Sequence, residues 1–486
     1  MAVEYSRALL LGAAASGRDE SALKAALEAS RVVVSIDPTL PASPLTAHVL
    51  LTTLRRLPGE LILERDGLPT RLVDELAAAV DAVDPERPLV VARGHDPTVR
   101  LHVGANCADR TVRLVPDGHG AHVAGQRTAV IRPTRPPSAL GAVYTAALGA
   151  AEAFKYTARV LPDRRVLHRH LRFCPVSLSS DLTAAPLLAE PVELNLTLVG
   201  VGAIGTGVVL LLAALGAEGR LVAVDYQPFG AENRGTYSLG GAAEMAAEPL
   251  KVDLAVWALP RFDVVPFPKR VENLTEAIDS GEVPWFPLVV AGLDTAEARR
   301  ATQRLWPDRL IDAATGDTML GIHDHVYDAG PCMDCFFPEE RGGPSAAERL
   351  AELTGIPAER LMRGDEPLTE ADLTGVDEEM RTRLAHHLGK PVCGLAQAFG
   401  LSALDGAGYQ PAVPFVSLQA AALAVGRVVA ARTGLSGLSN LVQYDGLFGP
   451  QTATLDDMTA VPECYCQKRA TTIAKVRAGR SSAYDA

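Results

Sequence analysis

The sequence predicts a two-part α/β protein whose second part is a Rossmann-like sheet of mixed or mostly parallel strands with flanking helices. Three observations predict this class. Strand-like and helix-like segments alternate from residue 194 to residue 328, a glycine-rich turn follows the first strand-like segment, and two segments of the first half have counterparts in the second. Strands that alternate with helices form parallel sheets covered on both faces.

The elements of the second half are expected in a simple chain order. The strand-like segments are LTLVGVG, RLVAVD, FDVVPFP, FPLVVAGLD, RLIDAATGD and LGIHDHVYD. The helix-like segments between them are IGTGVVLLLAALG, AEPLKVDLAVWALPR, VENLTEAIDSG and TAEARRATQRLWP. Farther on, VPFVSLQAAALAVGRVVAARTG is predicted to be a helix of small residues, which suits close packing.

Composition changes mark the expected domain boundaries. The proline-containing stretch SSDLTAAPLLAEPVE separates a first domain, residues 1–185, from a second, residues 186–486. Within the second domain, residues 339–410 are polar, acidic and helix-prone, so we expect a helical or mobile insertion there. Residues 411–486 follow as a crossover helix and a cysteine-bearing tail.

The first half contains an echo of the second. PLVVARGHD (88–96) resembles PLVVAGLDT (287–295), and SALGAVYTAALGAAEAFK (138–155) resembles VSLQAAALAVGRVVAAR (416–432). The shared order favours a degenerate duplicate, although alanine-rich helices can match by chance. The first half has no glycine-rich nucleotide loop, and the echo sets His95 at the place of Asp294.

Composition limits the classes of partner and the compartment. The chain has 486 residues, 48% of them hydrophobic and 21% charged, with a formal net charge of −12. This balance is that of a soluble globular protein and argues against general binding to nucleic acid or anionic membranes. Glu4 precedes the first short apolar run, so no secretory signal is expected. The seven cysteines, an odd number, favour a cytoplasmic protein with metal or thiol chemistry.

The glycine-rich turn GVGAIG carries a nucleotide signature. Gly200 suits a tight turn, Gly202 permits close approach of a phosphate, and Gly205 permits close packing of helix on strand. Asp225 ends the next strand, where a carboxylate can bind ribose hydroxyls. The motif alone is compatible with a dinucleotide, with another nucleotide or with a structural turn.

Residues downstream of Asp225 favour a triphosphate. Asn233, Arg234 and Lys251 follow it and can hold phosphate oxygens. Asp294 comes at the end of the fourth strand-like segment, where a carboxylate can bind magnesium. Hydride transfer by a dehydrogenase needs no such cluster, but each residue taken alone could equally be a solvated surface group.

Residues 194–335 resemble the ThiF/MoeB/HesA family, which includes the ubiquitin-activating enzymes. The likeness rests on GVGAIG, DYQPFGAENRG, EPLKVD, AGLDTAEARR and PCMDC, which occur in the family's order. It implies that the loop, including Ala203, holds ATP, that Asp225 binds the ribose, and that Asn233 and Lys251 contact phosphates. Asp294 would be the magnesium-linked aspartate needed for adenylation.

Two positions depart from the family pattern. The second acid of the family's D-x-D is Gln227 here, and Thr236 stands at the position of the family arginine. We expect Arg234 to substitute for that arginine from a neighbouring position.

Two cysteine pairs predict a structural zinc site. CMDC and CYC lie far apart in the chain, and four thiolates suit closed tetrahedral coordination. Members of the family commonly carry such a site, and here it would tie the tail to the core. Four ordinary reduced thiols are the alternative. The ligands would be Cys332, Cys335, Cys464 and Cys466.

Cys393 is a candidate acceptor thiol. It follows Lys390 and the His386–His387 pair, and family members with a thiol intermediate place their cysteine in this general region. A thiolate there could attack an acyl-adenylate. A buried, unreactive cysteine is an equally good interpretation. The basic stretch DRRVLHRHLRF (163–173) could supply a phosphate-binding arginine of the kind that family enzymes take from a partner, although a solvated helix face fits it better.

The sequence therefore predicts ATP-dependent adenylation of the C-terminal carboxylate of a ubiquitin-like protein, catalysed by Asp294, Lys251 and Arg234, with Cys393 receiving the acyl group. ATP, Mg²⁺ and structural Zn²⁺ are the expected cofactors. The first half would be an inactive adenylation-like domain or a peptide-recognition domain. A small carrier protein and a conjugating enzyme are the expected partners, without nucleic acid or membrane, and a homodimer is left open. The alternatives are activation of a sulfur-carrier protein or a ribosomally made peptide, an NAD-dependent oxidoreductase, and a non-catalytic scaffold.

Overall fold

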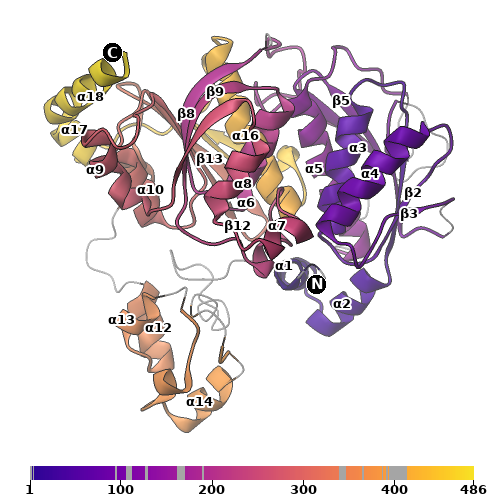
Figure 1. Cartoon of the computed structure of the whole chain (residues 1–486), viewed down its shortest axis with the longest axis horizontal. Helices are drawn as coiled ribbons and strands as arrows, with labels where there is room; N and C mark the ends of the chain where they lie inside the picture. Colours follow the sequence, from indigo (N-terminus) through magenta and orange to yellow (C-terminus); the bar gives the residue numbers. More distant parts are fainter. Residues whose placement is uncertain are drawn as a thin grey trace.

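The computed structural model of the chain has two α/β halves and a separate group of helices (Figure 1). It describes residues 3, 5–93, 96–105, 112–125, 130–160, 170–188, 191–338, 346–363, 366–385, 387–389, 392 and 413–485. The first half contains α1 (Ser6–Ser16), α2 (Glu20–Glu28), β1 (Arg31–Ile36), α3 (Ser43–Arg55), β2 (Glu60–Leu63), α4 (Thr70–Val83), β3 (Val90–Val91), β4 (Val99–Val103), β5 (Val112–Asp117), β6 (Gly120–Gly125), α5 (Ala139–Thr157) and β7 (His170–Phe173).

The second half has more elements. They are β8 (Glu193–Val199), α6 (Ala203–Ala214), β9 (Glu218–Val224), α7 (Ala242–Ala246), α8 (Lys251–Ala258), β10 (Phe262–Phe267), α9 (Leu274–Asp279), β11 (Leu288–Ala291), α10 (Ala296–Gln303), β12 (Arg309–Gly316), β13 (Met319–Val326), α11 (Met333–Phe336), α16 (Pro414–Arg432), β14 (Leu441–Asp445), β15 (Thr454–Asp456), α17 (Tyr465–Lys468) and α18 (Ala470–Asp485). The α/β class and the predicted order of strands and helices from residue 193 to residue 326 are confirmed.

Both halves arrange their strands in the same order. The first sheet runs β3-β2-β1-β4-β5-β6-β7, and the second runs β10-β9-β8-β11-β12-β13-β14, with β15 added at its edge. In each sheet the first five strands are parallel, and the next two pair antiparallel. In chain order, helix α5 lies between β6 and β7 of the first sheet, as α16 lies between β13 and β14 of the second. The two halves thus share one topology.

This topology corrects the strand correspondence inferred from the sequence echo. PLVVARGHD forms β3, whose positional counterpart is β10, whereas PLVVAGLDT forms β11, whose counterpart is β4. Short apolar runs look alike wherever they occur, so the match paired non-equivalent strands. His95 lies outside the described residues, and it is not the counterpart of Asp294. The helix match is correct, because α5 and α16 hold equivalent places.

The core joins the two halves. Helices α5 and α16 pack against each other and against α6 (Figure 1), and one buried apolar cluster includes residues of both sheets. Within it, the hydroxyls of Tyr144 and Tyr444 lie 3.1 Å apart, and the rings of Phe154 and Phe415 lie 5.5 Å apart. Helix α16 is long and apolar enough to cross a membrane, but 94% of its apolar window is buried inside the protein.

The outer faces of the two sheets differ. Beyond the second sheet, a second apolar cluster packs Val199, Val222 and Val289 against Trp285 and Met333. Parallel strands buried on both faces are expected to be apolar throughout, as these are. The face of the first sheet that meets α3 and α5 is apolar, whereas its other face carries buried polar side chains beside a small apolar cluster of Val115, Ala124 and Ile131.

The predicted insertion is helical where it is described. Its helices α12 (Ala346–Thr354), α13 (Ala358–Leu361) and α14 (Glu378–Ala385) share a small apolar core of their own. Figure 1 draws them below the two sheets. The core includes Leu350, Ile356 and Leu384, so amphipathic spacing rather than contact with the sheets buries these residues.

Candidate functional site

The glycine turn between β8 and α6 has the backbone geometry that its sequence predicts. Gly200 has φ +86°, and its N–H donates to the carbonyl of Val224 at 2.8 Å. A Cβ on Gly200 would lie 2.7 Å from the Gly292 oxygen, and one on Gly205 would lie 2.1 Å from the Gly200 oxygen. Both positions therefore require glycine. The absence of a Cβ at both positions lets the helix N-terminus approach the strand closely.

The N-terminus of α6 opens on free space. Gly202 caps this helix without any side chain, and Ala203 begins it. A Cβ on Gly202 would meet only the hydroxyl of Tyr237, at 3.7 Å. Because the first N–H groups of a helix have no partners within the helix, this end can receive the oxygens of a phosphate.

Asp225 lies directly beneath the glycine turn. Its carboxylate accepts hydrogen bonds from the N–H of Val201 at 3.0 Å and from the N–H of Gln227 at 2.9 Å. Burial raises the pKa of Asp225, and the negative charge of Asp294 adds to the increase, while Lys251 opposes it. The structure thus brings the two predicted aspartates and the predicted lysine to one edge of the sheet.

Lys251 is buried beside this carboxylate at the start of α8. Its Nζ donates to Oε1 of Gln227 at 2.6 Å and lies 5.5 Å from the ring centroid of Tyr237. Burial lowers the pKa of Lys251, but Tyr237 and Asp225 outweigh it and leave the pKa raised. Gln227, which replaces the second acid of the D-x-D pattern, thus contacts the lysine without adding a charge.

Two residues near Lys251 were not predicted. Tyr237 shares a small apolar cluster with Phe229, and its hydroxyl faces Gly202. Arg7 of α1 comes from the first half, and its positive charge lowers the pKa of both Tyr237 and Lys251. In the sequence, the available signal is that Arg7 is the sole charged residue of α1.

Asp294 is exposed in the turn between β11 and α10. The preceding carbonyl, that of Leu293, accepts hydrogen bonds from the guanidinium of Arg299 at 2.6 and 3.2 Å. Arg299 also pairs with Asp312 at 3.6 Å, and Asp312 contacts Nδ1 of His323 at 3.0 Å. A buried network therefore fixes the turn while the Asp294 carboxylate remains open to solvent.

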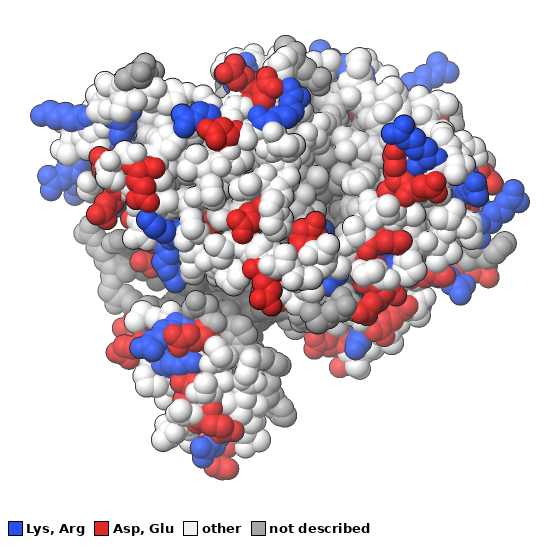
Figure 2. Space-filling view, viewed as in Figure 1, with Lys and Arg blue, Asp and Glu red and all other residues white. Residues whose placement is uncertain are grey.

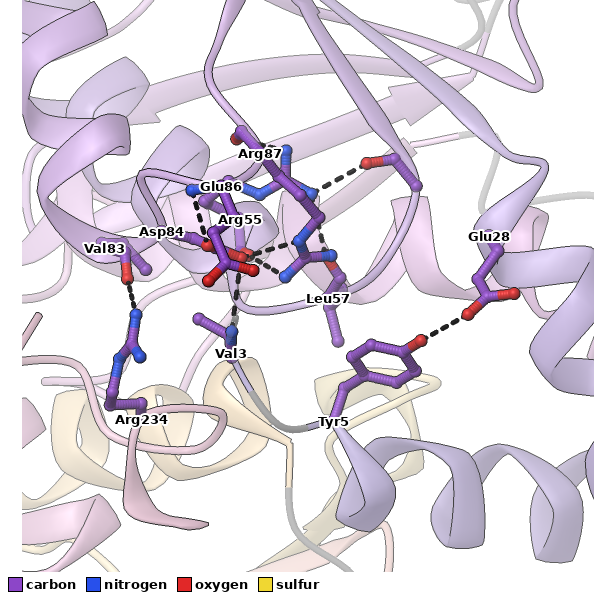
Figure 3. A network of polar contacts seen from close by, with 11 residues as sticks. Val3, Tyr5, Glu28, Arg55, Leu57, Val83, Asp84, Glu86, Arg87 and Arg234 are labelled. Carbon is purple, nitrogen blue, oxygen red and sulfur yellow. Dashed lines mark hydrogen bonds and ion pairs between the residues drawn. The ribbon is translucent and has the colours of Figure 1, made fainter. Parts of the chain in front are cut away.

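Asn233 and Arg234 have other partners than the sequence interpretation gave them. The side-chain oxygen of Asn233 accepts the N–H of Gly230 at 2.9 Å and closes a short turn. Arg234 is fully buried, and its guanidinium donates to the carbonyl of Val83 at the end of α4, at 2.6 Å (Figure 3). The expected phosphate contact of Arg234 is not supported, because its side chain joins the first half.

This junction is polar and buried. Asp84, next to Val83, pairs with Arg87 at 2.7 Å (Figure 3). Arg56 donates to the carbonyls of Arg234, Ser238 and Gly240. The arginines of each half thus cap carbonyl groups of the other half.

Four cysteine sulfurs form a candidate metal centre. All four Sγ atoms lie within 4.8 Å of one another, and three pairs are 3.6 to 3.8 Å apart. Tetrahedral bonds of about 2.3 Å to one ion would separate sulfurs by about 3.8 Å. The set therefore fits a metal ion such as zinc. Its members are Cys332, Cys335, Cys464 and Cys466.

The surroundings favour a bound cation. Burial and the neighbouring thiols raise the pKa of Cys332, because charged sulfurs this close would repel one another. The N–H of Val461 donates to Sγ of Cys335 at 3.4 Å, as outer hydrogen bonds to a metal ligand do. The predicted tie of the tail to the core is present, because Ile473 of α18 packs against Trp306 in the same cluster.

The candidate acceptor thiol and most of the basic stretch fall outside the part of the chain that the structure describes. Cys393, Lys390 and His386 lie outside the described residues, as do Cys107 and residues 163–169 of the basic stretch. The described end of that stretch is strand β7, which corrects the expected helix face. Arg172 lies on it.

Comparison with known proteins gives one relative and no family. No family model matches the chain. It is 34% identical over 217 residues to the uncharacterized protein y4jF of Sinorhizobium fredii (strain NBRC 101917 / NGR234). The match covers 43% of this chain and 40% of y4jF, so the chain spans less than half of that relative's length.

Proposed function

We propose that the second half adenylates the C-terminal carboxylate of a ubiquitin-like protein. The supporting observation is the grouping of an open helix N-terminus, Asp225, Lys251 and Asp294 at one edge of the sheet. This edge is where open parallel sheets bind nucleotides. In this proposal the helix N-terminus and these three residues have the roles that the resemblance to the ThiF/MoeB/HesA family implies.

The reaction requires positioning more than covalent catalysis. A carboxylate oxygen of the carrier protein attacks the α-phosphorus of ATP, the bond to the bridging oxygen breaks, and pyrophosphate leaves. Lys251 neutralises phosphate charge from its buried place, and the N–H groups at the start of α6 hold phosphate oxygens. Magnesium, held by Asp294, would supply further charge neutralisation; the exposed carboxylate oxygens suit this hard cation.

The first half contributes a cation to the same site. We assign to Arg7 the phosphate contact that the sequence interpretation gave to Arg234 or to the basic stretch. Its charge reaches Lys251 and Tyr237, whereas Arg234 is occupied by Val83. In this proposal the first half is an inactive adenylation-like domain that completes the site from within the same chain.

Cys393 remains the proposed acceptor of the acyl group. Its thiolate would attack the carbonyl carbon of the acyl-adenylate, forming a thioester as the bond to AMP breaks. Replacement of Cys393 by serine should abolish an adduct that thiol reagents release and leave pyrophosphate exchange unchanged. An adduct that persists and is still released by thiols would exclude Cys393.

The decisive experiment is ATP–pyrophosphate exchange. We expect exchange in the presence of small carrier proteins encoded near this chain, and a loss of about 10²–10³-fold in Asp294→Asn, which removes the metal-binding charge. Asp74→Asn, an exposed α4 carboxylate, is the matched control. Full exchange in Asp294→Asn would refute the mechanism.

The choice of carrier separates the remaining alternatives. If a sulfur-carrier protein or a ribosomally made peptide stimulates ATP–pyrophosphate exchange and a ubiquitin-like protein does not, the carboxylate of that carrier or peptide is the substrate. Hydride transfer to a nicotinamide without exchange would establish the oxidoreductase. If the chain binds a partner protein but catalyses neither reaction, it acts as a non-catalytic scaffold.

A further inference from the structure

The outer face of the first sheet is unusually polar for a central sheet. Side chains alternate along the strands, so those of the main apolar cluster face α5, while the opposite face combines polar side chains with a small apolar cluster of Val115, Ala124 and Ile131. Cross-strand register aligns Ser35 with His102, His102 with Arg113, and His122 with Arg172. Arg113 is completely buried and His122 nearly so. Buried polar side chains are costly unless they form hydrogen bonds or ion pairs.

A chain of hydrogen bonds runs through this face. Asp117, fully buried at the end of β5, contacts Nε2 of His122 at 3.0 Å, and Nδ1 of His122 contacts Nε2 of His170 at 2.9 Å. Asp117 also accepts the N–H and hydroxyl of Thr134 and the N–H of Arg135, all within 2.9 Å. Its charge is therefore compensated by groups within the protein.

A pocket of about 210 Å³ opens beside this chain. Arg172 and Ser180 line it and offer a guanidinium and a hydroxyl group, whereas the hydroxyl of Thr183, also in the lining, already donates to Asp181. Arg172 and Ser180 are exposed, so both can be reached from solvent. Asp181 is an acid in the wall, and it is occupied by the N–H of Thr183 at 2.9 Å and its hydroxyl at 2.7 Å.

Three arginines act on the groups around the pocket, whose lining also contains two carboxylates. Besides burial and His122, the charges of Arg172 and Arg113 lower the pKa of His170. Hydrogen bonds from Thr183 lower the pKa of Asp181, and the charges of Arg135 and Arg172 lower it further. Several guanidinium groups thus act on the same small volume, while both carboxylates there already accept hydrogen bonds.

We propose that this pocket is an anion-binding site of the first half, which takes the carboxylate or phosphate group of a small ligand through Arg172 and Ser180. The guanidinium can hold two oxygens at once, and hydroxyl groups complete such sites. The volume admits a terminal group with one or two small residues rather than a whole nucleotide. Asp117 and His122, which also line the pocket, hold Thr134 and His170 in place through hydrogen bonds. The site does not depend on adenylation in the second half.

Titration calorimetry with defined probes tests the site. The probes are inorganic phosphate and N-acetyl-glycylglycine, with the C-terminal amide of the same peptide as the neutral control. We expect binding of at least one anion in the full chain and no binding of the amide. Arg172→Gln should weaken it tenfold or more, while Arg432→Gln, an exposed arginine at the end of α16, leaves it unchanged.

The second half could also bind phosphate, so a further variant separates the two sites. Lys251→Gln should leave the Arg172-dependent binding intact. If inorganic phosphate binds more strongly than N-acetyl-glycylglycine, the natural ligand carries a phosphate group. If the peptide binds more strongly, the ligand carries a carboxylate. The proposal is overturned if wild type binds neither anion at millimolar concentrations, if the amide binds equally well, or if Arg172→Gln binds like wild type.

Discussion

The two halves have one strand order but differ at the edge where the second is proposed to bind ATP. After β8 the chain turns through Gly200 into open space at the start of α6. After β1 the equivalent turn has Asp37, whose carboxylate folds back on the N–H and hydroxyl of Thr39 at 3.0 and 2.6 Å. In the first half the turn after β1 is thus closed by the side chain of Asp37, whereas in the second half no side chain caps the N-terminus of α6. A duplicated topology has not preserved a duplicated site.

Both sheet edges have a glycine at an equivalent position. Gly104 follows β4 as Gly292 follows β11, and a Cβ on Gly104 would lie 2.6 Å from that of Asp37. Counting from these glycines, the counterpart of Asp294 is Asn106, which lies outside the described residues. Close approach of two strand ends is thus common to both halves, whereas the acid is not.

The largest expected effect comes from the metal centre, which has no counterpart among the described residues of the first half. Cys335→Ser should abolish binding of one zinc ion and lower the free energy of unfolding by more than about 5 kcal/mol, because metal binding is coupled to folding of the tail. Metal analysis and denaturant unfolding measure both. Cys174→Ser, a buried cysteine of the first half, should retain the metal. Full zinc content in Cys335→Ser would contradict the assignment.

The next effect tests whether the halves are one cooperative unit. Arg56→Met removes the donor to three carbonyls of the second half and should cost about 3 kcal/mol, since buried carbonyls are left without a partner. The exposed Arg71→Met should change stability by less than about 1 kcal/mol. Urea unfolding of the wild type should show one main transition. Two well-separated transitions, with Arg56→Met affecting neither, would show that the halves fold independently.

Sequence reasoning succeeded where local pattern determines structure. The periodicity of residues 193–326 located the strands, and the pairs CMDC and CYC located the four-cysteine cluster that could hold a metal ion. It failed where tertiary contact decides. Arg234 lies next to Asn233 in the chain, but the short turn at Gly230 sends its side chain toward Val83. Arg7 is far away in the chain, yet its charge acts on Lys251, which no local pattern indicates.

A matched pair of glycine variants sharpens the comparison at the sheet edges. Gly200→Ala and Gly104→Ala each force a side chain into a positive-φ position with a contact under 3 Å, so each should cost about 2 kcal/mol of stability. Gly200→Ala alone should also weaken ATP binding, measured by calorimetry. Equal loss of ATP binding in both variants would mean that the first half contributes a nucleotide loop after all.

The smallest effect concerns the one cation that the first half is proposed to give to the second. Arg7→Gln should lower the rate of ATP–pyrophosphate exchange about tenfold, or ~1.4 kcal/mol of transition-state stabilisation, because Lys251 and the helix N-terminus remain. Its melting temperature should stay near that of wild type. Lys24→Gln, an exposed residue of the neighbouring α2, controls for the loss of charge. An arginine that only packs α1 would show the reverse, a lower melting temperature with normal exchange. In that case the second half would carry its chemistry without help from the first.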